Sequence, residues 1–166
     1  SFPCNKREPG AGCAARFGEH HLHAIFGASA ACVAVHPSDL AVALTALDAV
    51  VVTRGPSGDR CLSLDDFYLL PGETPERETV LGHGDVIVAV EIPPLPLAAR
   101  SRYLKVRERA SFAFALVSVA AAVDLAADGT VRAARLALGV AAVLPSLSLL
   151  PGAVLNSSPA VEPSWT

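Results

Sequence analysis

Residues 117–138 read VSVAAAVDLAADGTVRAARLAL, and this stretch decides the fold class. Two apolar runs flank a short segment that holds Asp128 followed by Gly129. An Asp-Gly pair is typical of tight turns, because glycine tolerates the left-handed backbone conformation that such turns require. The stretch therefore predicts an antiparallel β-hairpin with strands at residues 117–125 and 131–138.

More strands are predicted on the N-terminal side of the hairpin. Residues 50–53 and 86–92 are rich in Val and Ile, which favour strands. A turn over residues 54–59 leads into a further strand at 60–64. Residues 101–107 alternate in character, so that Tyr103 and Lys105 share one polar face of a strand.

Two short helices are predicted between these strands. Ser38 or Asp39 can cap a helix in which apolar residues follow at helical spacing. Residues 65–67 open a second helix that stops before Pro71. Residues 24–35 are small and apolar, which is compatible with a buried strand. Because strands dominate and a few helices accompany them, the sequence predicts an α+β fold.

Composition and charge exclude several classes of protein. The chain has 166 residues, of which 52% are hydrophobic, and its net charge is only −3 without a basic block, which argues against nucleic-acid binding. The two most apolar stretches, residues 110–123 and 136–155, are broken by Ser, Gly and Pro, which argues against a membrane span. From residue 143 onward the chain is rich in Pro, Ser and Leu without any period, and an irregular tail is predicted.

Four cysteines offer the first hint of chemistry. They are spaced unlike the close pairs of a zinc finger or the short gaps of a ferredoxin, and they stand at Cys4, Cys13, Cys32 and Cys61. Spacing alone leaves three interpretations open: disulfides, buried free thiols, or an iron–sulfur cluster held by a long loop. The loop between the first two cysteines is rich in glycine and contains Lys6 and Arg7, and free amides and cations of this kind stabilise thiolate-bound clusters.

Several motifs, in this order, resemble a known family. They are CNKREPGAGCAA at residues 4–15, HAIFG at 23–27, HPSD at 36–39, GDVI at 84–87, EIP at 91–93, YLKVR at 103–107 and ALVSVAAA at 115–122. This combination, which covers roughly residues 1–142, resembles the FAD-binding (medium) subunit of the xanthine dehydrogenase or molybdenum hydroxylase family. Within that family it is most similar to the iron–sulfur-containing branch found in aldehyde oxidoreductases.

The resemblance implies how the chain is organised. Residues 1–35 would form a cluster-ligand loop and a strand leading out of it, and residues 36–95 the second subdomain of the flavin domain, an antiparallel sheet with helices. Residues 101–142 would be a partial domain like the C-terminal domain of carbon monoxide dehydrogenase flavoproteins. Residues 143–166 would be the irregular tail.

The resemblance also implies a metal site. Cys4, Cys13 and Cys32 match the last three of four cysteine ligands to a 4Fe-4S cluster, and the first ligand is expected upstream of Ser1. Their sulfurs should therefore lie close together. Cys61 falls where the family has a strand residue other than cysteine, so we expect it to stand apart from the cluster, in a strand.

Three residues match flavin contacts of the family. Asp39 matches an acidic contact, Ile87 an apolar residue against the ring, and Lys105 a basic contact near the isoalloxazine. The resemblance implies that all three face one groove, with Lys105 partly exposed and without an internal carboxylate beside it. Judged as residues alone, Asp39 also suits a helix cap, Ile87 a core position and Lys105 a solvated surface.

No catalytic side chains stand out. Neither a Ser-His-Asp set nor a paired-carboxylate arrangement is visible, and His20, His21 and His23 are interpreted as incidental surface histidines. The function implied by the resemblance is electron transfer from iron–sulfur centres through FAD to an external acceptor. Its partners would be a molybdopterin-binding large subunit and a 2Fe-2S small subunit, in the cytoplasm or in an exported periplasmic complex. Two alternatives are a truncated remnant that binds no cofactor and a secreted domain linked by disulfides.

Overall fold

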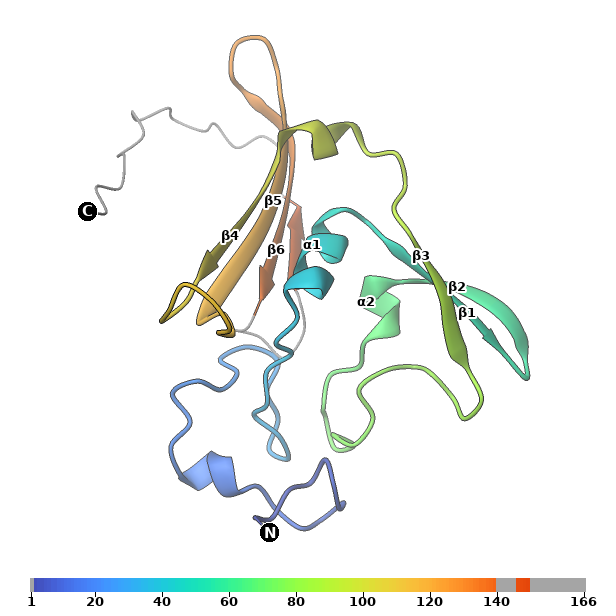
Figure 1. The fold of residues 1–166 in the computed structure, drawn as a ribbon, viewed down its shortest axis with the longest axis vertical. Helices are drawn as coiled ribbons and strands as arrows, with labels where there is room; N and C mark the ends of the chain where they lie inside the picture. Colours follow the sequence, from blue (N-terminus) through green and yellow to red (C-terminus); the bar gives the residue numbers. More distant parts are fainter. Residues whose placement is uncertain (1, 140–145, 150–166) are drawn as a thin grey trace.

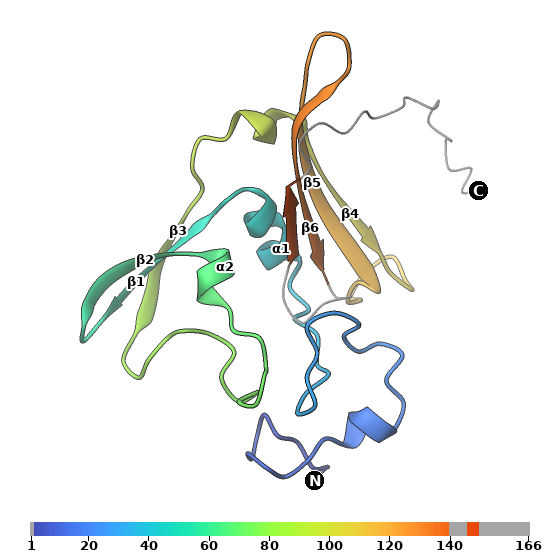
Figure 2. The same cartoon turned by 180° about the vertical axis from the view of Figure 1, so that it is seen from behind.

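The computed structural model describes residues 2–139 and 146–149. Two antiparallel sheets lie on either side of two short helices, and the loops of residues 2–35 lie at one end of the molecule (Figure 1). The view from behind shows the same separation of the two sheets (Figure 2). The α+β prediction is thus confirmed.

The first sheet contains the strands predicted in the middle of the chain. Its strands are β1 (Val50–Gly55), β2 (Gly58–Ser63) and β3 (Val86–Glu91), in the order β2-β1-β3. A two-residue connection at Pro56 and Ser57 joins the first two strands, with Gly55 opposite Gly58. Strand β3 is exposed along its whole length, so this sheet presents an apolar edge to its surroundings.

The second sheet is built on the predicted hairpin. Its strands are β4 (Ser101–Val106), β5 (Val117–Leu125), β6 (Val131–Gly139) and β7 (Ser146–Leu149), in sequence order. Strands β5 and β6 are antiparallel and are joined by the Asp-Gly turn, in which the Gly129 amide donates to the Ala126 carbonyl at 3.0 Å. The hairpin prediction is confirmed.

The predicted irregular tail is wrong for its described part. Residues 146–149 form strand β7, which pairs with residues 135–138 of β6. Open backbone groups along β6 provide partners that the tail's own composition does not reveal. The rest of this segment lies outside the described residues.

Both predicted helices are present, and each is capped by a serine. In α1 (Asp39–Ala46) the Ser38 hydroxyl accepts a hydrogen bond from the Ala41 amide at 3.1 Å. In α2 (Leu64–Phe67) Ser63 accepts from the Asp66 amide at the same distance. Two 3-10 turns, η1 (Ala14–Phe17) and η2 (Pro96–Arg100), complete the elements. In the described part of the chain, no helix has the length and apolarity needed to traverse a bilayer.

The buried strand considered for residues 24–35 is absent. This segment folds back on itself, because the Ala24 amide donates to the Val33 carbonyl and the Ser29 amide to the Cys32 carbonyl, each at 2.9 Å. Its backbone groups are thus satisfied locally rather than in a sheet. Within the segment Cys32 alone is buried, with 7% of its surface exposed.

Helix α1 connects the two halves of the fold. Its Val42 and Ala46 form one core cluster with Ala120 and Ala137 of the second sheet. A second cluster lies between the first sheet and α2, and it consists of Ala49, Val51, Leu64 and Phe67. Helix α1 therefore precedes the first sheet in sequence but packs against the second, and the division into two domains stays a prediction.

The contact between α1 and β6 depends on Gly139. A Cβ atom there would lie 2.4 Å from Val42 Cγ2 and 2.6 Å from Ser118 Oγ. We expect Gly139→Ala to lower the free energy of unfolding by about 1–3 kcal/mol, the usual cost of overpacking, in a urea titration. The control is Gly82→Ala, where the new Cβ would meet only Asp85 Oδ2 at 3.5 Å. Equal stability of the two variants would contradict this packing argument.

Candidate functional site

The start of α1 and one face of β4 form a cluster of polar side chains. The two oxygens of the Asp39 carboxylate accept separate hydrogen bonds. Oδ1 accepts from the Tyr103 hydroxyl and Oδ2 from Lys105 Nζ, each at 2.7 Å. Tyr103 and Lys105 lie two residues apart in a strand and so point to the same side of the sheet. Two of the three predicted flavin residues are therefore adjacent.

The cluster keeps Asp39 ionised. The hydrogen bond from Lys105 is the main reason why the pKa of Asp39 lies below its usual value, and the hydrogen bond from Tyr103 acts in the same direction. Burial, followed by the nearby carboxylate, raises the pKa of Tyr103. The Lys105 side chain is 19% exposed and that of Asp39 48% exposed. The arrangement thus presents a carboxylate whose exposed side faces solvent and whose donors lie on β4.

One expectation about Lys105 is wrong. The ammonium group was expected to have no internal carboxylate partner, yet it forms an ion pair with Asp39. The reason lies in the helix cap: Ser38 provides the capping oxygen, which leaves the Asp39 carboxylate free to reach β4. Sequence alone allowed either residue to cap, so it could not reveal this division of roles.

Ile87 lies in a different part of the fold. It belongs to β3 in the first sheet, is paired with Thr53 and is 50% exposed. The helices stand between this sheet and β4 (Figure 1). No contact joins Ile87 to the cluster in the interactions described, so a groove shared by Asp39, Ile87 and Lys105 stays a prediction.

The cysteine loop brings two of the predicted ligands face to face. Cys4 and Cys13 form an isolated antiparallel bridge at the two ends of their loop. All four cysteines are free thiols, which does not support the disulfide alternative. Cys61 lies in β2 and is exposed, as expected for a residue outside the site.

The Asn5 carboxamide ties the three cysteine segments together. It follows Cys4 directly, its Oδ1 accepts from the Gly12 amide at 2.7 Å, and its Nδ2 donates to the Ala31 carbonyl at 2.8 Å. Gly12 precedes Cys13 and Ala31 precedes Cys32. One side chain therefore holds the backbones beside all three cysteines. Sequence analysis missed Asn5, because nothing in its neighbours signals where its amide is directed.

A preassembled metal site is not present in the described residues. Among them, no group of three or more His, Cys, Asp and Glu side chains is arranged to hold a metal ion. The three sulfurs therefore do not form a ready-made metal site, and their convergence and the roles of Cys4, Cys13 and Cys32 stay predictions. The Cys32 sulfur instead accepts a hydrogen bond from the Ala34 amide at 3.4 Å.

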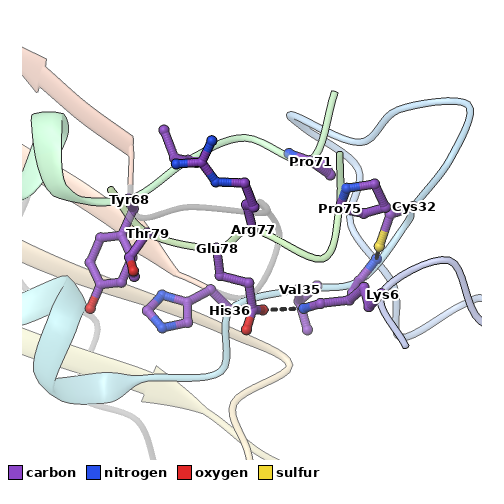
Figure 3. Close-up of a pocket in the computed structure, with 12 residues that line it drawn as sticks. Lys6, Cys32, Val35, His36, Tyr68, Pro71, Pro75, Arg77, Glu78 and Thr79 are labelled. Atoms are coloured by element: carbon purple, nitrogen blue, oxygen red, sulfur yellow. Dashed lines mark hydrogen bonds and ion pairs between the residues drawn. The ribbon is translucent and has the colours of Figure 1, made fainter. Parts of the chain in front are cut away.

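A small cavity lies between the cysteine loop and the segment that follows α2 (Figure 3). It measures about 140 Å³, and an ion pair between Lys6 and Glu78 crosses it. His36 lines it, with its ring 4.6 Å from that of Tyr68. Burial lowers the pKa of His36, and its buried Nδ1 has no hydrogen-bond partner in the described structure. The Lys6–Glu78 pair fastens the cysteine loop to the rest of the fold.

The described residues also line a second, larger groove. It measures about 830 Å³ and lies between residues 21–25 and 108–117. Phe112 and Phe114 line it and are 95% and 74% exposed. His21 and His23 belong to its lining, whereas His20 hydrogen-bonds to the Gly18 carbonyl at 2.8 Å.

The sequence of the chain is similar to those of known proteins. Residues 26–95 match the family model "FAD binding domain in molybdopterin dehydrogenase". The chain is 54% identical over 144 residues to the aldehyde oxidoreductase FAD-binding subunit PaoB of Escherichia coli K12. This match covers 86% of the chain but 43% of that relative, so the chain spans less than half of its length.

Solved structures show the same fold. Quinoline 2-oxidoreductase of Pseudomonas putida 86 is 27% identical with a TM-score of 0.56, over 84% of this chain and 44% of that one. Carbon monoxide dehydrogenase of Oligotropha carboxidovorans has a TM-score of 0.57 over 65% of this chain and 35% of that one, and at 21% identity it supports the fold alone. The family match covers residues 26–95, which contain both α-helices and the first sheet, and it shows what this segment is similar to.

Proposed function

We propose that the chain is part of the FAD-binding, electron-transferring subunit of a molybdenum-dependent oxidoreductase of the aldehyde or xanthine type. The observation that carries this proposal is the match of residues 26–95 to an FAD-binding domain, and the Asp39–Lys105 ion pair lies where this matched segment meets the second sheet. Its support from relatives is the similarity to an aldehyde oxidoreductase FAD-binding subunit. An aldehyde is accordingly the proposed substrate of the whole enzyme.

The residues present suit one wall of a flavin site. A flavin ring needs an apolar surface and fixed polar groups at its edge. Ile87 belongs to a strand of half-exposed Val and Ile side chains, and Asp39 with Lys105 supplies a partly exposed charged pair. When bound, FAD would accept and release electrons, while Lys105 would provide positive charge near the ring and Asp39 a hydrogen-bond acceptor.

We further propose a 4Fe-4S cluster on Cys4, Cys13 and Cys32, with a fourth ligand from upstream. Its support is the Asn5 network, together with the free thiols on either side of it. Because the sulfurs are not preassembled, binding would reorganise the loop around the backbone positions that Asn5 fixes. Electrons would then pass from iron–sulfur centres to FAD and an external acceptor.

The proposed partners are a molybdopterin-binding large subunit and a 2Fe-2S small subunit. Their support is that the similar E. coli protein is named as a subunit. A cytoplasmic complex is proposed, with an exported periplasmic complex as the alternative.

The test of the flavin proposal is Lys105→Ala in the full-length subunit within its complex. We expect FAD to dissociate roughly tenfold more readily, because a charged partner near the ring is lost. Oxidation of aldehyde with a dye that takes electrons before the flavin should change little. Bound FAD per complex and its dissociation constant are the measurements.

The matched control is Arg102→Ala. Arg102 is an exposed cation on the same strand, but its position places it on the opposite face from Lys105. Its loss should leave FAD binding unchanged. If both variants retained FAD as well as the wild type does, Lys105 would have no part in flavin binding.

A further inference from the structure

Tyr103 holds the second oxygen of the carboxylate proposed to face the flavin. Its hydroxyl donates to Asp39 Oδ1 at 2.7 Å, whereas Lys105 occupies Oδ2 at the same distance. These two donors therefore do not compete for one oxygen. Neither the family match nor the resemblance assigns a role to this tyrosine.

We propose that Tyr103 is a positioning residue that keeps the Asp39 carboxylate in place while the Lys105 ammonium group leaves Asp39 and contacts the flavin. This inference rests on the proposed flavin site. It assigns the Asp39–Lys105 pair a second state in which the ammonium group turns to the cofactor. In that state the carboxylate still has a donor and remains aimed at the same place.

The stiffness of the three side chains favours this division of roles. Lysine carries its charge on a flexible stem and reorients readily. The tyrosine ring has few rotatable bonds and extends from a strand that pairs with β5 along its whole length. Asp39 is fixed at the first turn of α1 by the Ser38 cap. Lys105 is therefore the mobile member of the cluster, and Tyr103 and Asp39 are the fixed ones.

Electrostatics give the hydroxyl an effect that the ring cannot have. With only Lys105 as donor, Asp39 would hold the ammonium group more tightly, and less positive charge would be available to the flavin. The hydroxyl also lowers the pKa of Asp39, after the larger effect of Lys105. Phenylalanine would preserve the packing of the ring and remove both effects.

The experiment compares Tyr103→Phe with wild type in the full-length subunit of the intact complex. We expect the FAD dissociation constant to rise roughly tenfold, because one hydrogen bond to a charged group is lost. The flavin reduction potential should also become more negative. FAD affinity should fall on the acid side as Asp39, the proposed hydrogen-bond acceptor for the flavin, becomes protonated. In Tyr103→Phe this fall should occur at higher pH, because the pKa of Asp39 rises without its donor. A purely structural role would lower the melting temperature and leave the potential and the pH profile unchanged.

The control is Tyr68→Phe, at the other of the chain's two tyrosines, which stacks beside His36. Identical affinity, potential and pH profile in the two variants would overturn the role of Tyr103. Asp39→Asn separates this failure from that of the flavin site. If Asp39→Asn weakens FAD binding and Tyr103→Phe does not, only the positioning role is wrong; if neither weakens it, the site itself is wrong.

Discussion

Serine in place of Cys4, Cys13 or Cys32 should remove nearly all cluster iron from the full-length protein. A 4Fe-4S cluster needs four thiolate ligands, and an alcohol is a poor substitute for a thiolate at iron. Each single substitution is expected to remove the cluster's content of about four iron and four sulfide ions per subunit, together with its broad visible absorbance. FAD content, measured separately, should fall far less, because Asp39 and Lys105 are untouched.

The control for this prediction is Cys61→Ser. Cys61 lies in β2, opposite Val52, and is exposed, so it offers a chemically identical change away from the loop. Iron content should match that of the wild type. Wild-type protein without iron, or an equal loss in Cys61→Ser, would reject the cluster proposal.

Local patterns were predictable from sequence because their causes are local. The hairpin at residues 117–138 follows from two apolar runs around Asp128 and Gly129, and the start of α1 follows from Ser38. The adjacency of Asp39 and Lys105, which are 66 residues apart, came only from the family resemblance. Their direct ion pair could not be foreseen, since it depends on which residue caps the helix.

The predictions were wrong where the hydrogen-bond partners of a segment are distant in sequence, and where a segment forms its hydrogen bonds within itself. Strand β7 forms because β6 offers an open edge. Residues 146–149 do alternate between Ser and Leu, but four residues are too few to predict a strand beside the Pro- and Ser-rich sequence around them. Residues 24–35 are apolar enough for a strand but bond to themselves. The Asn5 network is invisible for a similar reason: one amide bonds to Ala31, 26 residues away.

We expect the packing of α1 on the second sheet to depend strongly on Arg135. From strand β6 it reaches the end of α1, where Nε donates to the Ala46 carbonyl at 3.0 Å and Nη2 to Asp48 Oδ1 at 2.7 Å. Its side chain is only 13% exposed. The last carbonyls of a helix lack partners within the helix, so this guanidinium satisfies one of them and joins the helix to the sheet.

We expect Arg135→Ala to lower the free energy of unfolding by about 2–3 kcal/mol, since it removes a charge-assisted hydrogen bond and leaves a helix carbonyl without its partner. The control is Arg132→Ala on the same strand. Arg132 forms an equally close ion pair with Asp124, but its side chain is 60% exposed. That loss should cost under about 1 kcal/mol, as for other surface ion pairs. Arg135→Lys should fall between them, because one ammonium group cannot reproduce the planar fork. Urea titrations of the three variants measure the order, and equal losses at positions 132 and 135 would show that the helix end does not depend on the guanidinium.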